Sequence, residues 1–325
     1  MENKIKKILL LILPIALGVF LIWYSLSKLT SDDIDTIKHS FKTANYRWVL
    51  LSLFFGVLSH LSRAYRWKFL LEPMGYKPKL ANSFMSVMMA YILNLAIPRS
   101  GEVARAASLK KYENIPFEKA FGTIVAERVA DLIILFGIIG VAFYFQTDLI
   151  GSYIFKNNSS NISYFKITLI AGVPIIGFLS YYLLRNTNTP IISKIIEFIN
   201  GLIEGALSIL KMKKKWAFIF HTFFIWLMYV LMFYVVTFAL PETTNISFSA
   251  IIVAFVAGTF AMVLTNGGLG SYPVFITGAF AIYAINKSTG MAFGWIMWVA
   301  QTLMVIVLGG LSFILIPIYN NYLDK

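Results

Sequence analysis

The chain has 325 residues, of which 58% are hydrophobic and 13% are charged, and its mean hydropathy is +0.75. Soluble domains carry roughly 25% charged residues, so this composition excludes an ordinary soluble protein and indicates an all-α integral membrane protein. The formal net charge of +13 would favour nucleic acid in a soluble chain. Here the basic residues separate apolar segments, where they orient spans and meet anionic lipid, so we expect no nucleic-acid partner.

Several chemistries are excluded by the residues that are missing. The chain has no cysteine, and therefore no disulfide, thiolate nucleophile or Cys-based metal site. It contains no GxxxxGK[ST] motif for ATP. Its histidines are scattered at His39, His60 and His221, without metal-ligand spacing, and we interpret them as packing or interface residues. We therefore expect no metal, no cofactor and no enzymatic activity.

The apolar segments follow one another along most of the chain. The first one follows Lys4, Lys6 and Lys7 and is long enough to span a membrane. No small-residue cleavage site follows it, so we predict that it is not cleaved. At about 20 residues per span, we predict full spans over residues 8–26, 48–62, 120–145, 167–184, 216–240 and 291–318.

Two further apolar stretches contain helix breakers where a span should continue. Pro98-Arg99-Ser100-Gly101 interrupts the first, and Asn266-Gly267-Gly268-Leu269-Gly270 interrupts the second. We predict two re-entrant helical hairpins, over residues 81–109 and 248–285. If the first one crossed completely, the basic loops on its two sides would lie on opposite faces of the membrane. Entry and return from the cytoplasm avoids this.

The same charge rule predicts the second hairpin to enter from the outer face and both termini to lie in the cytoplasm, with the protein in the cell (inner) membrane. The result is about six full spans and two hairpins from opposite faces, in a single transmembrane domain over residues 1–325. Its halves are 8–145 and 166–318, a conjectural inverted repeat, because broken helices in each half build transporter sites. Residues 34–44, after Ser31 and Asp32 as N-cap, and residues 190–212 are predicted as interfacial helices.

Ionisable residues gather around the first hairpin. Charged groups at membrane depth are costly, so a cluster of them is a hypothesis for a functional site. The cluster consists of Arg99, Glu102, Arg105, Glu127, Arg128 and Asp131. Its charges balance, which leaves a purely structural ion network open as the alternative.

The functional interpretation is phosphate binding. Guanidinium binds phosphate in bidentate fashion, so Arg99 and Arg105 are the candidates for an anionic headgroup, with Glu102 beside them. Glu127, Arg128 and Asp131 would form the ion network or coupling group. From the second break we add four residues whose amide or backbone can approach a ligand: Asn266, Gly267, Gly268 and Gly270.

Motifs in the chain resemble a known family. Pro98-Arg99-Ser100-Gly101-Glu102 with Arg105, Glu127-Arg128-Val129-Ala130-Asp131 and Gly267-Gly268-Leu269-Gly270 occur in the order found in the membrane domain of the lysylphosphatidylglycerol synthase/flippase family. The resemblance covers essentially the whole chain and implies a domain that moves lipids between leaflets. It also implies that the six charged residues are family motif positions.

The resemblance has two limits. Some relatives carry a cytosolic aminoacyl-transferase domain, whereas this sequence ends at Lys325 directly after its last span, so synthase activity is not expected. Many relatives also have an acidic residue where this chain has Pro273, which puts the role of that acid in doubt here.

The leading hypothesis is a flippase-like transporter of a phosphate-bearing lipid, either a phospholipid or a polyprenyl-phosphate-linked one. Two alternatives remain: a membrane-embedded enzyme or accessory protein of lipid-linked sugar and cell-envelope metabolism, with Glu127 or Asp131 as base, and a small-anion transporter. The expected partners are membrane lipids with anionic headgroups, and the small residues of the last span leave a homo-oligomer open.

Overall fold

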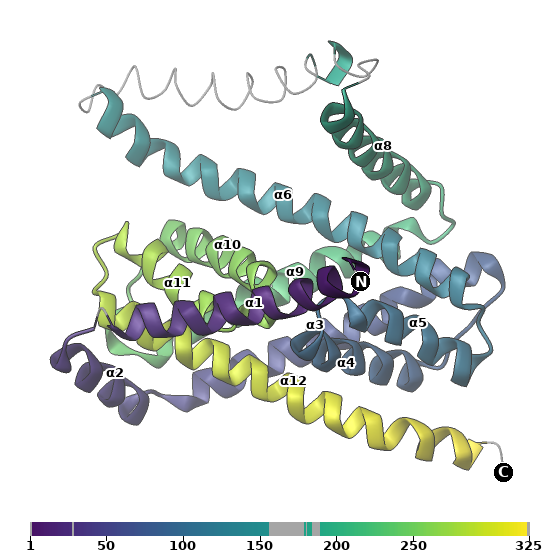
Figure 1. Cartoon of the computed structure of the whole chain (residues 1–325), viewed down its shortest axis with the longest axis horizontal. Coiled ribbons are helices and arrows are strands. Elements are labelled where there is room, and N and C mark those ends of the chain that lie inside the picture. Colours follow the sequence, from purple (N-terminus) through teal and green to yellow (C-terminus); the bar gives the residue numbers. More distant parts are fainter. Residues whose placement is uncertain (1, 28, 156–178, 180, 184–188, 324–325) are drawn as a thin grey trace. The chain divides into compact units, whose positions relative to one another are not determined.

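A computed structural model describes residues 2–27, 29–155, 179, 181–183 and 189–323. Every regular element in these ranges is helical, as the composition predicts (Figure 1). The α-helices are α1 (Glu2–Ser27), α2 (Ser31–Thr43), α3 (Tyr46–Leu71), α4 (Leu80–Ala96), α5 (Ser100–Glu113), α6 (Phe117–Phe155), α8 (Pro190–Leu210), α9 (Lys215–Val236), α10 (Phe248–Leu264), α11 (Ser271–Ala281) and α12 (Lys287–Leu323). Short 3-10 turns are η1 (Glu72–Met74), η2 (Thr237–Ala239), η3 (Pro241–Thr243) and η4 (Asn266–Gly268).

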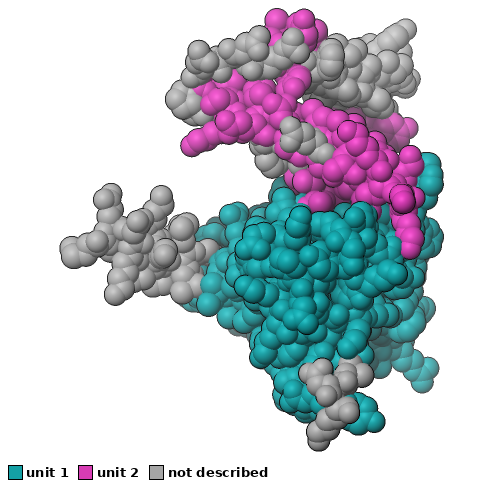
Figure 2. All heavy atoms as spheres, turned by 90° about the vertical axis from the view of Figure 1, so that its right-hand side faces the viewer, with its two compact units in different colours: residues 1–125, 216–325 teal, residues 126–215 magenta. Residues whose placement is uncertain are grey.

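The chain separates into two compact units, coloured separately in Figure 2. The first consists of residues 1–125 and 216–325, and the second of residues 126–215. Each is described by itself. The arrangement as one transmembrane domain with halves 8–145 and 166–318 stays a prediction.

Four described helices are long and apolar enough to cross a membrane: Tyr46–Met74, Phe117–Thr147, Lys215–Ala239 and Lys287–Tyr322. They coincide with the predicted spans at 48–62, 120–145, 216–240 and 291–318. The predicted first span, 8–26, lies within α1, and most of the predicted span 167–184 falls outside the described residues. The chain is an all-α integral membrane protein.

The end of the second span differs from the prediction. The span was predicted to end at residue 62, but α3 continues to Leu71 and buries Arg63 and Arg66, which are 3% and 0% exposed. Arg66 Nη1 donates to Thr222 Oγ1 of α9 at 2.8 Å, and its guanidinium lies 5.1 Å from the centre of the Phe218 ring. Packing against α9 therefore holds the Arg66 charge inside the first unit.

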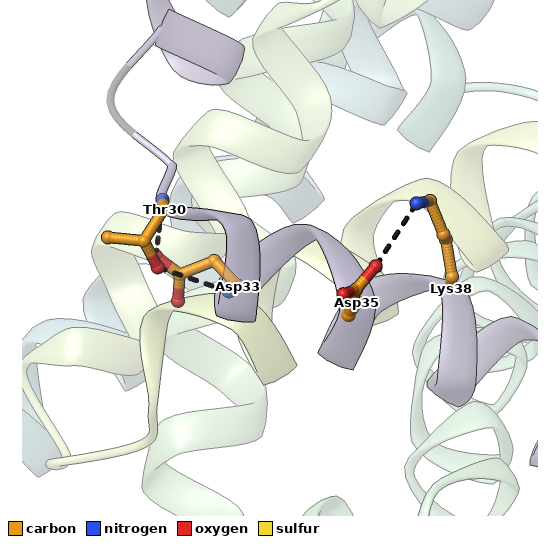
Figure 3. Close-up of polar contacts among 4 residues, drawn as sticks. All are labelled: Thr30, Asp33, Asp35 and Lys38. Carbon is orange, nitrogen blue, oxygen red and sulfur yellow. Dashed lines mark hydrogen bonds and ion pairs between the residues drawn. The ribbon is translucent and has the colours of Figure 1, made fainter.

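The bounds of two other helices also differ from the predicted ones. Helix α6 extends to Phe155, ten residues past the predicted end of its span at residue 145. Helix α2 begins at Ser31, before the predicted segment 34–44, because Thr30, not Ser31 or Asp32, is its N-cap. Thr30 Oγ1 accepts from the backbone N–H of Asp33 at 3.2 Å, while the Asp33 carboxylate accepts from the Thr30 N–H at 3.0 Å (Figure 3). This reciprocal capping box satisfies two N–H groups that a helix start leaves unpaired.

The predicted hairpins are confirmed as helical pairs: α4 with α5, and α10 with α11. The first turn is forced by Pro98, which cannot continue a helix, and its arms pack very closely because Gly101 lies on the Ala90 carbonyl. Ser86 and Ser108 hydroxyls are 2.7 Å apart across the same pair. In Figure 1 the two hairpins lie towards opposite ends of α12.

Contacts along α12 show how the second hairpin runs. Near the start of α12, Gly290 packs against Thr277 of α11. Two turns further on, Trp298 Nε1 donates to the Gly267 carbonyl at 2.7 Å. The α10–α11 hairpin therefore follows α12 from its N-terminal end inwards and turns beside Trp298.

The first hairpin follows α12 from the other end. Asn320 and Asn82 exchange side-chain amide hydrogen bonds of 2.9 and 2.8 Å at the base of α4. Further in, Gly309 packs against Ile92. At 1.5 Å per residue, Gly290 and Asn320 are about 45 Å apart, which is close to a whole bilayer with its headgroups. The hairpins thus begin near opposite ends of α12 and turn part-way along it, while their entry from the cytoplasmic and the outer face stays a prediction.

The order of elements also supports the predicted repeat. A long helix, a 17-residue arm, a shorter arm and another long helix follow one another as α3, α4, α5 and α6. The same order returns in α9, α10, α11 and α12, again with a 17-residue first arm.

Candidate functional site

The turn of the first hairpin is built by Asn94. Its Oδ1 accepts from the Gly101 N–H at 2.8 Å, and its Nδ2 lies 3.5 Å from Glu102 Oε2. The start of α5 needs this acceptor because the first N–H groups of a helix have no partner within it. Ser100 Oγ closes the turn by donating to the Ile97 carbonyl at 2.8 Å.

Arg99 occupies the strained position of this turn. Its φ is 63°, in the left-handed region that non-glycine residues avoid at a cost of roughly 1–2 kcal/mol. Its side chain is exposed, directly before the N-terminus of α5. Strained residues concentrate at functional sites, where the surrounding structure holds them in place. Arg99 therefore stays the foremost candidate from the sequence.

The second turn holds a buried polar group. Thr265 and Ser271 hydroxyls lie 2.8 Å apart and Ser271 Oγ donates to the Ala261 carbonyl, which closes the turn between α10 and α11. Asn266 is 8% exposed, and its amide nitrogen has no hydrogen-bond partner among the described residues. Buried amides are normally satisfied, so this N–H group is available for a ligand oxygen.

The two turns meet. A β-carbon on Gly267 would collide with Leu95 Cδ2 unless the leucine side chain shifted, so glycine fits this close approach best. Gly270 lies equally close to the Gly18 carbonyl of α1. We call Asn94, Leu95, Arg99, Asn266 and Gly267 the tip junction. The structure thus brings the predicted breaks together at one place, and Gly268, 78° in φ, packs beside it against Tyr272.

Arg105, the other predicted phosphate ligand, lies away from the turn. It is 3% exposed, and its guanidinium carbon lies 3.7 Å from the centre of the Trp67 ring of α3. Trp67 Nε1 in turn donates to Thr123 Oγ1 at 2.7 Å. Trp67 also belongs to a buried apolar cluster with Leu71 and Leu109. Arg105 therefore has a packing role in this position, and a role in substrate binding stays a prediction.

Arg63 and Arg66 are the charged residues that the sequence analysis missed as interior groups. A signal for them was present: small and basic residues recur at helical spacing, one turn after another, on one side of α3, as Ser52, Gly56, Ser59, Arg63 and Arg66. All five are buried.

The second unit holds Glu127, Arg128 and Asp131 on α6. Glu127 and Asp131 share a helical face, as predicted, and are 1% and 6% exposed, while Arg128 lies on the exposed side. In the same unit Gly205 of α8 packs on Val129, so α8 lies along this part of α6. Residues Pro190–Leu210 of the predicted segment 190–212 are helical, and the interfacial position of that segment stays a prediction. The role of Glu127, Arg128 and Asp131 as an ion network or coupling group also stays a prediction.

Pro273 packs between helices. It is buried in the first turn of α11, where a proline is tolerated, and a β-carbon on Gly294 of α12 would lie 2.5 Å from its Cα. This close helix contact takes the place of the acidic side chain expected from the resemblance.

An integral membrane protein with two opposed re-entrant helical hairpins, meeting at their turns against a long helix, is the class that these features define. The chain belongs to the family described as the lysylphosphatidylglycerol synthase transmembrane region, whose sequence profile matches residues 11–309.

The individual relatives that match the chain share a third of their aligned residues with it or fewer. A UPF0104 membrane protein of Methanocaldococcus jannaschii is 27% identical over 347 aligned positions, which cover 97% of each chain. A second UPF0104 membrane protein, from Pyrococcus horikoshii, is 26% identical over 39% of this chain and 37% of its own. The glycosyltransferase AglD of Haloferax volcanii is 33% identical over 26% of this chain and 14% of its own. No solved structure shows a significant match.

Proposed function

We propose that this protein is a flippase-like transporter that moves a phosphate-bearing lipid, either a phospholipid or a polyprenyl-phosphate-linked one, between the leaflets. The observation that carries the proposal is the contact of Gly267 with Leu95, which places the turns of two opposed hairpins together part-way along α12. Broken helices that meet near the midplane are the sites of many transporters. Family membership supports a function connected with membrane lipids.

The tip junction offers the chemistry that a phosphate headgroup requires. The Arg99 guanidinium stays charged when it leaves water and matches phosphate in shape. It stands at the N-terminus of α5, where the helix dipole favours an anion. The Asn266 amide supplies a neutral donor from the second hairpin. The acyl or prenyl chains would remain in the bilayer while the headgroup crosses.

The free energy for net lipid transport would come from a source other than ATP hydrolysis by this protein. The sequence carries no phosphate-binding ATP loop. Net movement would then follow a lipid gradient, the membrane potential or an ion, with Glu127 and Asp131 as the groups that hold the arginines or carry protons. The termini would lie in the cytoplasm, as the distribution of Lys and Arg favours.

A leaflet-exchange assay tests the proposal. Purified protein is reconstituted into liposomes that contain trace fluorescent phosphatidylglycerol, and dithionite added outside bleaches only the outer leaflet. We expect bleaching beyond the outer half with wild type, and a much slower second phase with Arg99→Gln. Lys110→Gln, an exposed change further along α5, is the matched control.

The assay is repeated with a fluorescent polyprenyl phosphate and with a neutral diacylglycerol analogue. If wild type exchanges neither phosphate-bearing lipid beside a working scramblase control, the proposal is wrong.

One observation favours a second candidate. The partial similarity to a protein named as a glycosyltransferase fits a membrane-embedded enzyme or accessory protein that acts on lipid-linked sugars. Purified protein incubated with a lipid-linked sugar would then form a new product, and Asp131→Asn would abolish it. Exchange without product formation rejects this candidate.

A further inference from the structure

Four helices of the first unit meet at a group of aromatic side chains away from the tip junction. His60 of α3 lies 4.5 Å from Tyr91 of α4 and 6.2 Å from Tyr229 of α9, measured between ring centres. Trp226 of α9 lies 6.1 Å from Tyr229 and 6.5 Å from Phe255 of α10. We call these five residues the aromatic junction. It contacts the first arms of both hairpins, α4 through Tyr91 and α10 through Phe255.

The aromatic junction contains two buried polar atoms, Trp226 Nε1 and His60 Nδ1, that no other described residue satisfies. Trp226 is 9% and His60 4% exposed. Neither Trp226 Nε1 nor His60 Nδ1 has a hydrogen-bond partner within the described ranges of the chain. Beside them, the Tyr91 and Tyr229 hydroxyl oxygens lie 3.2 Å apart. A buried indole N–H normally finds a partner, and an unmade hydrogen bond is destabilising, so both atoms require an explanation.

The chemistry of these groups selects the kind of ligand atom. An indole N–H can only donate, and the imidazole Nδ1 donates in the tautomer that carries its proton there. A ligand that satisfies both atoms must therefore present acceptor oxygens. Arg63, one turn after His60 on α3, is also buried and adds positive charge on the same helix. A phosphoryl group has both the oxygens and the negative charge.

We propose that the aromatic junction is a second binding subsite for a phosphoryl group, in which the Trp226 N–H and His60 bind its oxygens. The lipid as the source of that group rests on the proposed function, whereas the subsite rests on the unsatisfied donors. The headgroup would then bind between the first arms of the hairpins as well as at their turns. Trp226 is a substrate-binding residue in this scheme, and the two tyrosines position it.

Trp226→Phe is the informative variant because it keeps an aromatic ring and removes the N–H donor, while the smaller ring also leaves a cavity that lowers stability. If that donor binds no ligand, lipid exchange stays at the wild-type rate. If it binds phosphate, exchange falls, because a hydrogen bond to a charged group contributes about a tenfold change or more. Trp216→Phe is the matched control on the same helix, since Trp216 is 75% exposed.

The first measurement observes binding without transport. The chain has seven tryptophans, so protein labelled with 15N-tryptophan in micelles gives few indole signals, and the signal missing in Trp226→Phe belongs to Trp226. We expect this signal to move on titration with dihexanoylphosphatidylglycerol and to stay in place with the matching diacylglycerol. A signal that stays in place with the phospholipid overturns the subsite. Equal movement with inorganic phosphate alone supports the phosphoryl subsite and overturns the lipid as its source.

The second measurement is leaflet exchange. We expect Trp226→Phe to exchange phosphatidylglycerol about tenfold more slowly than wild type and Trp216→Phe, with a melting temperature lowered by the lost ring volume. Exchange at the wild-type rate overturns the subsite, whatever the melting temperature. If wild type exchanges no lipid while the Trp226 signal still moves, the proposed function fails and the subsite stands.

Discussion

Gly267 lies against the Leu95 side chain, so that the turns of two hairpins from opposite ends of α12 touch at this point. A β-carbon at Gly267 would displace the end of that side chain, and the backbone there has φ 60°, which other residues adopt only with strain. One position therefore combines a close approach and a special conformation.

We expect Gly267→Ala to destabilise the protein by about 1–3 kcal/mol, because the left-handed backbone alone costs roughly 1–2 kcal/mol and the methyl group meets Leu95. Lipid exchange should fall as well, because the added methyl group forces the two turns apart. Thermal unfolding in detergent and the liposome assay measure both effects. Gly140→Ala on α6, where a β-carbon meets nothing within 4 Å, should leave both unchanged or slightly increase stability. Equal stability of Gly267→Ala and wild type would contradict the prediction.

Arg99 and Asn114 allow strain and function to be separated, because both have positive φ at the two ends of α5, 63° and 53°. We expect Arg99→Gly and Asn114→Gly each to raise the free energy of unfolding by about 1 kcal/mol, since glycine adopts this conformation without a steric penalty. Only Arg99→Gly should slow the exchange of anionic lipid. If both variants lost exchange equally, the added backbone freedom and not the loss of the guanidinium would be the cause.

Arg105 and Trp67 form a buried cation–π pair, with the guanidinium 3.7 Å from the ring centre. Such a pair contributes about 2 kcal/mol or more when it is desolvated. We expect Arg105→Lys to lower stability by about that amount because ammonium does not stack as a plane does. Lys110→Arg, on the exposed side of the same helix, should change stability by less than about 0.5 kcal/mol. Unfolding midpoints in detergent measure both, and equal midpoints would contradict the role of the stack.

Asp33 gives the start of α2 a pH dependence. Hydrogen bonds from the backbone and then the side chain of Thr30 hold the pKa of the Asp33 carboxyl below its usual value of 3.8. A lowered folded-state pKa stabilises the folded form fully above the unfolded pKa, and the effect is lost as pH falls through the folded value. We expect amide exchange in the first turn of α2, corrected for intrinsic rates, to accelerate below about pH 4.

The control for this prediction is Asp35→Asn, because Asp35 pairs with Lys38 at 3.1 Å on an exposed surface, where an ion pair contributes little (Figure 3). That variant should keep the acid-dependent exchange of wild type, whereas Asp33→Asn should remove it. A wild-type first turn whose protection does not depend on pH would contradict the prediction.

Much of the fold could be predicted because membrane-spanning helices appear in a sequence as long apolar segments. Twenty apolar residues have few alternatives to a helix in lipid, and Pro98 and the glycines after Asn266 can only interrupt one. The hairpins, four of the long helices and the helices after Ser31 and Pro190 follow from such local signals. Helix ends could not be predicted as well, since α3 continues past Ser62 on tertiary contacts.

The candidate site shows the same division. The sequence by itself determined which residues break the helices and which charges are costly in a membrane. It pointed to the charged Arg99 at one break and to the uncharged Asn266 and Gly267 at the other. Only the tertiary structure decided that Gly267 meets Leu95, that Arg105 stacks on Trp67, and that Arg66 reaches Thr222. Composition and periodicity describe one helix at a time, whereas these contacts join residues of different helices through packing that no local pattern records.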